Sequence, residues 1–87
     1  MTYTVQWARK TLKQLEKLDR IAQKKVVLAV TKLASNPRPP GVKSLVTRPG
    51  EYRLRVGDYR VVYEIHDDRV IVLVVTVAHR REVYRAP

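Results

Sequence analysis

The sequence predicts a small α+β protein in which a helical hairpin packs on one face of a mainly antiparallel sheet. Apolar and polar residues alternate at the N-terminus, apolar residues recur at helical spacing from about residue 8 to residue 35, and alternation returns from Glu51 onward. The order of elements is therefore β-α-α-β-β-β. Residues 1–87 are expected to form one domain.

The first elements are a short strand and two helices. Thr2 to Trp7 alternates apolar and polar side chains, as a half-buried strand does. The first helix has a strongly basic face and an apolar stripe formed by Ala8, Leu12, Leu15 and Leu18. The second helix is expected to run to about Ser35, and Asp19 can cap its start. Its predicted apolar positions are Ile21, Ala22, Val26, Val27, Val30, Leu33 and Ala34.

A proline-rich segment, Asn36 to Gly41, ends the second helix, because proline cannot continue a helix and pushes the residue before it into an extended conformation. The next segment, Val42 to Gly50, is predicted to be a loop or a weak edge strand.

Three strands follow this segment, and they are predicted at Glu51–Val56, Tyr59–His66 and Val70–Ala78. The first two are joined by Gly57-Asp58, and a glycine in the first position of a two-residue loop is typical of a type II′ hairpin turn. Asp67-Asp68 forms the second turn, whose length of two or three residues is left open. The last strand begins with an unbroken apolar run, so we expect it to be central and covered on both faces.

A two-residue loop in the first hairpin separates basic from apolar side chains. One face carries the residues that fit against the helices, namely Tyr52, Leu54, Val56, Tyr59, Val61, Tyr63 and Ile65. Arg53, Arg55 and Arg60 share the other face. Like charges placed opposite each other destabilise a hairpin, and guanidinium groups bind phosphate oxygens bidentately. The pattern predicts a phosphate site, unless Glu51 or Glu64 neutralises these arginines or the register slips by one residue.

The last stretch is also basic. His79 to Arg85 contains three arginines, a histidine and a tyrosine. Tyr84 offers a ring on which an unpaired base can stack, whereas the structural alternative is a solvated tail with Tyr84 packed on the sheet. The sequence leaves open whether His79 or Arg80 faces the arginines of the hairpin.

Composition narrows the function classes. The chain has 18 Lys and Arg against 8 Asp and Glu, a net charge of +10, which favours nucleic acid or an acidic protein as partner. The absence of cysteine excludes a disulfide scaffold, a Cys-type zinc site and a thiol nucleophile. Nucleotide-binding loops and hydrolase motifs are missing, carboxylates are too sparse for a two-metal nuclease, and we expect neither a metal nor another cofactor. The apolar runs are too short to span a membrane, so we expect a cytoplasmic protein with no membrane partner.

The whole chain resembles the RelE/ParE superfamily of type II toxin–antitoxin toxins. The resemblance is carried by Tyr3 to Val5, the basic hairpin ending near Asn36-Pro37, the segment Tyr52 to Tyr63, and the run Val77 to Tyr84. It implies the RelE-like microbial ribonuclease fold. The RelE branch implies a toxin that cuts messenger RNA in the ribosomal A site and inhibits translation. Its chemistry is metal-free: the ribose 2′-OH attacks the adjacent phosphate and leaves a 2′,3′-cyclic phosphate and a 5′-OH.

The resemblance also implies the site residues, which are Arg53, Arg55, Arg60, Arg80 and Tyr84, with His79 and Arg81 as further candidates. Familiar RelE members carry lysines where this chain has Arg53 and Arg55. Since arginine effectively cannot lose a proton, these two residues are expected to hold the phosphate and stabilise its added charge. The general base stays open between Tyr84, His79 and the ribosome.

Two alternatives remain at this point. The ParE branch inhibits DNA gyrase by binding, and in that case the arginines would form a protein contact and Tyr84 would be structural. A plain RNA-binding module would bind RNA without cleaving it. Either kind of toxin implies an acidic, RelB-like antitoxin, and the resulting complex is expected to bind operator DNA.

Overall fold

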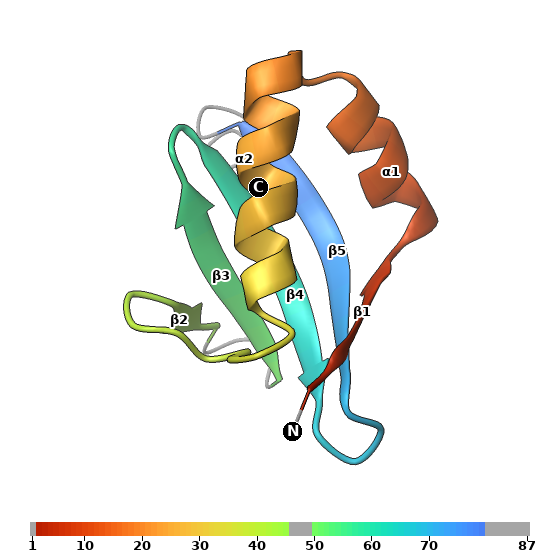
Figure 1. The fold of residues 1–87 in the computed structure, drawn as a ribbon, viewed down its shortest axis with the longest axis vertical. Helices are drawn as coiled ribbons and strands as arrows, with labels where there is room; N and C mark the ends of the chain where they lie inside the picture. The colour runs from red at the N-terminus through yellow and green to blue at the C-terminus, as the bar shows by residue number, and fades with distance from the viewer. Residues whose placement is uncertain (1, 46–49, 80–87) are drawn as a thin grey trace.

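In the computed structural model, which describes residues 2–45 and 50–79, two helices pack against a five-stranded sheet (Figure 1). The elements are β1 (Thr4–Trp7), α1 (Arg9–Glu16), α2 (Arg20–Lys32), β2 (Lys43–Ser44), β3 (Glu51–Val56), β4 (Tyr59–His66) and β5 (Ile71–His79). This arrangement confirms the predicted fold class. The segment predicted as a loop or weak edge strand contains the two-residue β2.

The sheet has the strand order β1-β5-β4-β3-β2. β1 runs parallel to β5, and the other neighbours are antiparallel. β5 therefore lies inside the sheet, between β1 and β4, as its apolar run predicts. It is fully buried only on the side of the helices, because the residues that alternate with its buried positions are half-exposed.

β5 begins one residue later than predicted. Val70 has a φ of 56° and belongs to a four-residue turn, Asp67 to Val70, rather than to the strand. The pairing of β4 with β5 also shifts between Val62 and Tyr63, where β5 carries an additional residue, Val75. Such a bulge exchanges the faces on which the following side chains lie.

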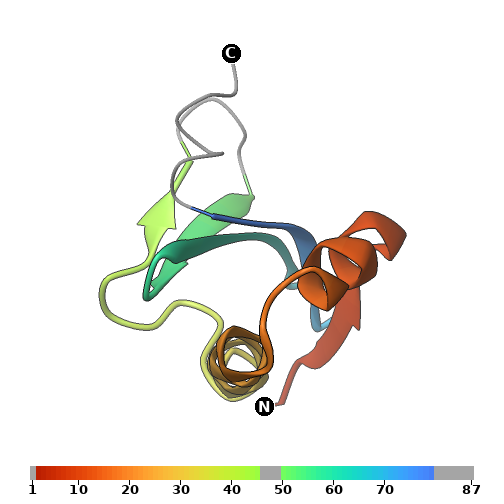
Figure 2. The ribbon, with the colours of Figure 1, turned by 90° about the horizontal axis from the view of Figure 1, so that it is seen from above.

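The core fills the space between α2 and the sheet. Viewed from above, α2 lies over one face of the sheet, and α1 lies beside the edge of the sheet near β5 (Figure 2). The buried cluster consists of Val26, Val30, Leu33, Val61, Tyr63, Ile65, Val72, Val74 and Val77. Burying one such aliphatic or aromatic side chain contributes about 1.5 to 3 kcal/mol, so this cluster holds α2 against the central strands.

The inward face of α1 differs from the predicted stripe. Leu12 is 48% exposed, whereas Thr11 is fully buried. Gln14 also faces the sheet, because its Oε1 accepts a hydrogen bond of 2.8 Å from the backbone N–H of Val77. β1 ends opposite Val74. Beyond that point α1 takes the place of a strand along this edge of β5, while the other edge of β5 stays paired with β4.

The predicted stripe of α2 is wider than the surface that the sheet covers. Ala22 and Val26 point inward, as predicted, but Ile21 is 70% exposed and Val27 is 39% exposed. Positions at i and i+4 face the sheet, and the residues beside them fall on the flank of the helix. The prediction is therefore wrong for Ile21 and Val27.

The predicted cap of α2 is confirmed, since Asp19 Oδ1 accepts a hydrogen bond of 2.8 Å from the N–H of Ala22. Asp19→Ala should lower the free energy of unfolding by about 1 kcal/mol, because it leaves an amide of the first turn without its acceptor. Urea unfolding measures the loss. Asp68→Ala, at an exposed turn position, removes the same charge without removing a cap. Equal losses in the two variants would contradict the capping role.

Candidate phosphate-binding site

The β3–β4 hairpin has the register predicted from its turn. Arg55 lies opposite Arg60, and Arg53 lies opposite Val62. Gly57 has a φ of 58°, while Asp58 is not among the described residues with positive φ. That combination is the one a type II′ turn requires. The arginines consequently lie on the face that is turned away from the helices.

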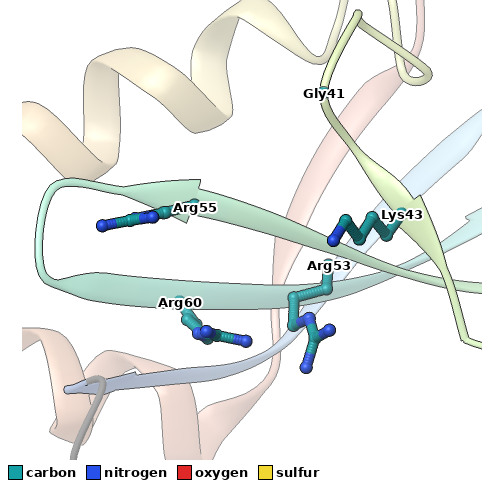
Figure 3. Close-up of a pocket in the computed structure, with 5 residues that line it drawn as sticks. All are labelled: Gly41, Lys43, Arg53, Arg55 and Arg60. Carbon is teal, nitrogen blue, oxygen red and sulfur yellow. The ribbon is translucent and has the colours of Figure 1, made fainter.

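These three arginines line one pocket of about 210 Å³, together with Gly41 and Lys43 (Figure 3). Lys43 enters the pocket from β2, where it pairs with Arg53 of β3. Four cationic side chains from three strands therefore meet at one place on the open face of the sheet. Lys43 was not among the residues singled out from the sequence, since a two-residue strand has no alternation from which its register could be inferred.

The four cationic side chains do not point the same way. Arg53 and Arg60 are half-buried, and their side chains point toward one another (Figure 3). Arg55 is exposed and runs toward the turn, where its Nε donates a hydrogen bond of 3.3 Å to the carbonyl of Gly57. Lys43 extends from β2 toward Arg53. Arg53 and Arg60 are thus the pair arranged to hold one anionic group between them.

The pocket suits a phosphate group. Its volume is below the range of about 300 to 1,000 Å³ that holds a drug-sized molecule, so it accommodates a single small group of a larger ligand. Guanidinium groups match phosphate oxygens with paired hydrogen bonds. Among the described residues, the lining contains no carboxylate, and the overall charge of +10 attracts polyanions.

A second, wider hollow of about 440 Å³ continues the open face of the sheet. It is lined by Ala8, Lys10, Leu45, Glu51, Val62, Glu64, Val75 and Thr76. Glu64 Oε1 lies 2.8 Å from His66 Nε2, so the contact of this carboxylate in the structure is with a histidine on its own strand. The wider hollow leaves room for a chain that extends beyond the arginine pocket.

His79 lies on the opposite face of the sheet from the arginines. It pairs with Tyr59, whereas Arg60 pairs with Ala78. The rings of His79 and Tyr59 meet edge to face, with their centroids 5.3 Å apart. A hollow on the helical side, lined by Gln14 and Lys17 among others, includes both rings. The structure therefore does not bring His79 to the arginine pocket.

The other predicted site residues, Arg80, Arg81 and Tyr84, lie outside the described residues. Within residues 2–45 and 50–79, no group of three His, Asp or Glu side chains is arranged to hold a metal ion. In the same part of the chain, no helix is long and apolar enough to cross a membrane.

The loop that leads into the pocket is fastened to the sheet. The hydroxyl of Tyr63 donates a hydrogen bond of 2.7 Å to the carbonyl of Pro37. Burial raises the pKa of Tyr63 to about 12, so the hydroxyl keeps the proton that it donates. The neighbouring Arg38 donates to Tyr52, with its Nε 3.2 Å from the hydroxyl oxygen. These contacts hold the start of the segment that contains Gly41 and β2, whose residue Lys43 lines the pocket together with Gly41.

Arg38 also forms an ion pair with Asp67, in which Nη2 lies 2.8 Å from Oδ2. The hydrogen bond from Arg38, followed by that from Tyr3, lowers the pKa of Asp67 below its ordinary value. Both partners are about half-exposed, so we expect a small contribution to stability. The contact ties the loop after α2 to the turn between β4 and β5.

The ion pair predicts a dependence of stability on pH. Because the pKa of Asp67 is lower in the folded state than in the unfolded state, its contribution is present above the unfolded pKa and is lost as pH falls through the folded pKa. Urea unfolding of the wild type and Asp67→Asn should therefore show a difference near neutral pH that shrinks progressively as the pH falls below about 4, the ordinary pKa of aspartate. A difference that stays constant down to pH 2 would contradict this assignment.

Comparison with known proteins defines the class. The family model described as "ParE toxin of type II toxin-antitoxin system, parDE" matches residues 5–84. The chain therefore belongs to this family of toxins. The match spans the arginine hairpin and most of the C-terminal run.

Within the superfamily, the similar proteins are RelE-like toxins. Toxin RelG of Mycobacterium tuberculosis is 33% identical over 86 residues, which is 98% of this chain and 99% of that protein. A RelE-like toxin protein of Escherichia coli is 31% identical over 81 residues, or 92% of this chain and 85% of its own length. The protein is a RelE-like toxin of a type II toxin–antitoxin system.

Solved structures agree with this placement. The archaeal RelE–RelB complex from Pyrococcus horikoshii contains a chain with a TM-score of 0.83 and 26% identity, covering 99% of this chain and 100% of that one. A variant of the E. coli toxin RelE in the free state has a TM-score of 0.80 and 28% identity, covering 97% and 92%. This chain therefore shares the RelE fold with both of these solved structures.

Proposed function

We propose that this single toxin domain is a metal-free, ribosome-dependent endoribonuclease that cleaves messenger RNA in the A site and so inhibits translation. The observation that carries the proposal is the pocket of three arginines and one lysine on the open face of the sheet. A pocket with four positive charges repels a metal ion and provides the charge stabilisation that a metal would otherwise supply. The relatives of this chain are RelE-like toxins, and this likeness supports a ribonuclease rather than a gyrase inhibitor.

The proposed reaction is an attack of the ribose 2′-oxygen on the adjacent phosphorus, which breaks the bond from phosphorus to O5′. The products are a 2′,3′-cyclic phosphate and a free 5′-OH. Arg53 and Arg60, which point toward one another, hold the non-bridging oxygens and stabilise the negative charge that grows on them. Removing one such donor typically costs about 10²- to 10³-fold in rate. Arg55 adds charge from the hairpin end.

Arg80 and Tyr84 complete the proposed site. Arg80 would add a further cation for the phosphate, and Tyr84 would stack on a base next to the cleaved bond. Arg81 is a further candidate for a phosphate contact. His79 is left out of the proposal, because it packs against Tyr59 on the other face.

The proposed partners are the ribosome with its messenger RNA and an acidic, RelB-like antitoxin. Similar toxins are found in complexes with RelB from P. horikoshii and E. coli. On this chain, Ile21 is 70% and Leu28 is 62% exposed on α2, beside lysines such as Lys24. An amphipathic acidic helix would cover this apolar surface and neutralise part of the charge. The toxin–antitoxin complex is proposed to bind operator DNA, in the cytoplasm.

A reconstituted translation reaction tests the proposed function. Purified protein is added, and messenger RNA ends are mapped by primer extension, with a gyrase supercoiling assay run on the same sample. New ends within A-site codons that disappear with Tyr84→Ala are the expected result. Intact messenger RNA together with inhibited supercoiling would overturn the proposal and would instead identify a gyrase inhibitor of the ParE kind.

A further inference from the structure

Lys43 differs chemically from the rest of the pocket. Among the described residues that line it, Lys43 is the one side chain that can release a proton, since the other cations are guanidinium groups and Gly41 has no side chain. Arginines can hold and neutralise a phosphate but effectively cannot exchange a proton with it. A lysine ammonium group is charged at neutral pH and carries a proton that it can give away.

RNA cleavage needs such a donor. When the bond from phosphorus to O5′ breaks, the bonding electron pair stays on O5′ and produces an alkoxide. A strongly basic alkoxide is a poor leaving group unless a proton reaches it as the bond breaks, and a positioned general acid contributes about 10²- to 10⁴-fold to the rate. The donor must lie beside the phosphate site without displacing the groups that hold the phosphate.

The position of Lys43 meets this requirement. It lies on β2, next to Arg53 of β3 in the strand register, and its side chain extends toward the pocket from the edge of the sheet (Figure 3). Arg53 and Arg60 point toward one another within the same pocket. The ammonium group therefore approaches a phosphate held by these arginines from one side. The anchored loop preceding Gly41 fixes where β2 meets β3.

We propose that Lys43 is the general acid of the cleavage reaction, an assignment that rests on the ribonuclease function proposed above. The 2′-oxygen forms a bond to phosphorus and its proton passes to water. The bond from phosphorus to O5′ breaks, and O5′ takes a proton from Nζ of Lys43 to become the 5′-OH. The resulting neutral amine regains a proton from solvent, so the group is restored for the next turnover.

The test compares Lys43→Met with Lys43→Arg in single-turnover cleavage on programmed ribosomes. One messenger RNA is ordinary, and a second carries sulfur in place of the bridging O5′ at the cleavage site. A thiolate leaves without taking up a proton, so the sulfur substrate does not need the acid. With ordinary RNA, both variants should be slower than wild type by about 10²-fold or more. With the sulfur substrate, both should cleave within a few fold of wild type.

Two controls separate proton donation from charge and from folding. Lys32→Met removes the same charge at the end of α2 and should cleave both substrates like wild type. Arg60→Ala should stay slow on both substrates, because sulfur at the bridging position does not replace a contact to the non-bridging oxygens. Thermal unfolding confirms that each variant is folded.

Restoration of normal cleavage by Lys43→Arg would show that charge alone matters and would overturn the assignment. A defect of Lys43→Met that persists on the sulfur substrate would overturn it as well. If wild-type protein cleaves neither RNA, the proposed ribonuclease function itself fails, and this outcome is distinct from a failure at Lys43.

Discussion

Arg60→Ala is expected to slow the cleavage of A-site messenger RNA by about 10²- to 10³-fold, which is the usual effect of removing one donor to developing negative charge. Arg60 faces Arg53 across the pocket, so the variant leaves the phosphate held from one side only. Single-turnover cleavage on programmed ribosomes measures the loss, and growth inhibition on expression in cells should fall in parallel.

Arg69→Ala is the matched control for this experiment. Arg69 is exposed in the turn between β4 and β5. This variant therefore also removes one positive charge, but at a position outside the pocket, and it should cleave like wild type. Both substitutions leave the buried cluster intact, and unfolding curves should be close to that of the wild type. Equal cleavage rates for Arg60→Ala and wild type would remove the arginine pocket from the mechanism.

Tyr63→Ala should have the largest effect on stability, lowering the free energy of unfolding by about 3 to 5 kcal/mol. Tyr63 is fully buried in the core. Its ring stacks on the ring of Tyr52, with the two centroids 5.9 Å apart, and its hydroxyl donates a hydrogen bond to the carbonyl of Pro37. Since small domains unfold at a cost of about 5 to 15 kcal/mol, this loss is a large fraction of the total stability.

Tyr63→Phe separates packing from hydrogen bonding. This variant keeps the ring and loses the hydroxyl, so the expected loss is about 1 to 3 kcal/mol, the cost of leaving a buried carbonyl without its donor. Guanidinium unfolding of both variants provides the comparison. A loss for Tyr63→Phe as large as that for Tyr63→Ala, or no loss at all, would contradict the role assigned to the bond with Pro37.

The β3–β4 hairpin shows what the sequence predicts well. A glycine in a two-residue turn fixes the register of both strands, and strict alternation then assigns Arg53 and Arg60 to one face. Helix faces were predicted less well, because apolar spacing does not reveal how wide a surface the sheet covers. Leu12 and Ile21 fit the helical stripe but lie outside this surface.

Two features of this region escaped prediction, namely the place of Lys43 in the pocket and the face on which His79 lies. Lys43 comes from a strand of two residues, and so short a segment has no alternating pattern from which its pairing could be read. The face of His79 depends on the length of the second turn and on the bulge at Val75, and each of these changes the parity of β5. Neither leaves a recognisable signal in the sequence.

The most direct test is the structure of this protein on a ribosome programmed with messenger RNA whose A-site nucleotides carry 2′-O-methyl groups, which prevent the attack. We expect the phosphate to be cleaved to lie between Arg53 and Arg60, within hydrogen-bond distance of both guanidinium groups, with Lys43 beside O5′. A phosphate bound on the helical face, or an arginine pocket that is turned away from the messenger RNA, would contradict the account.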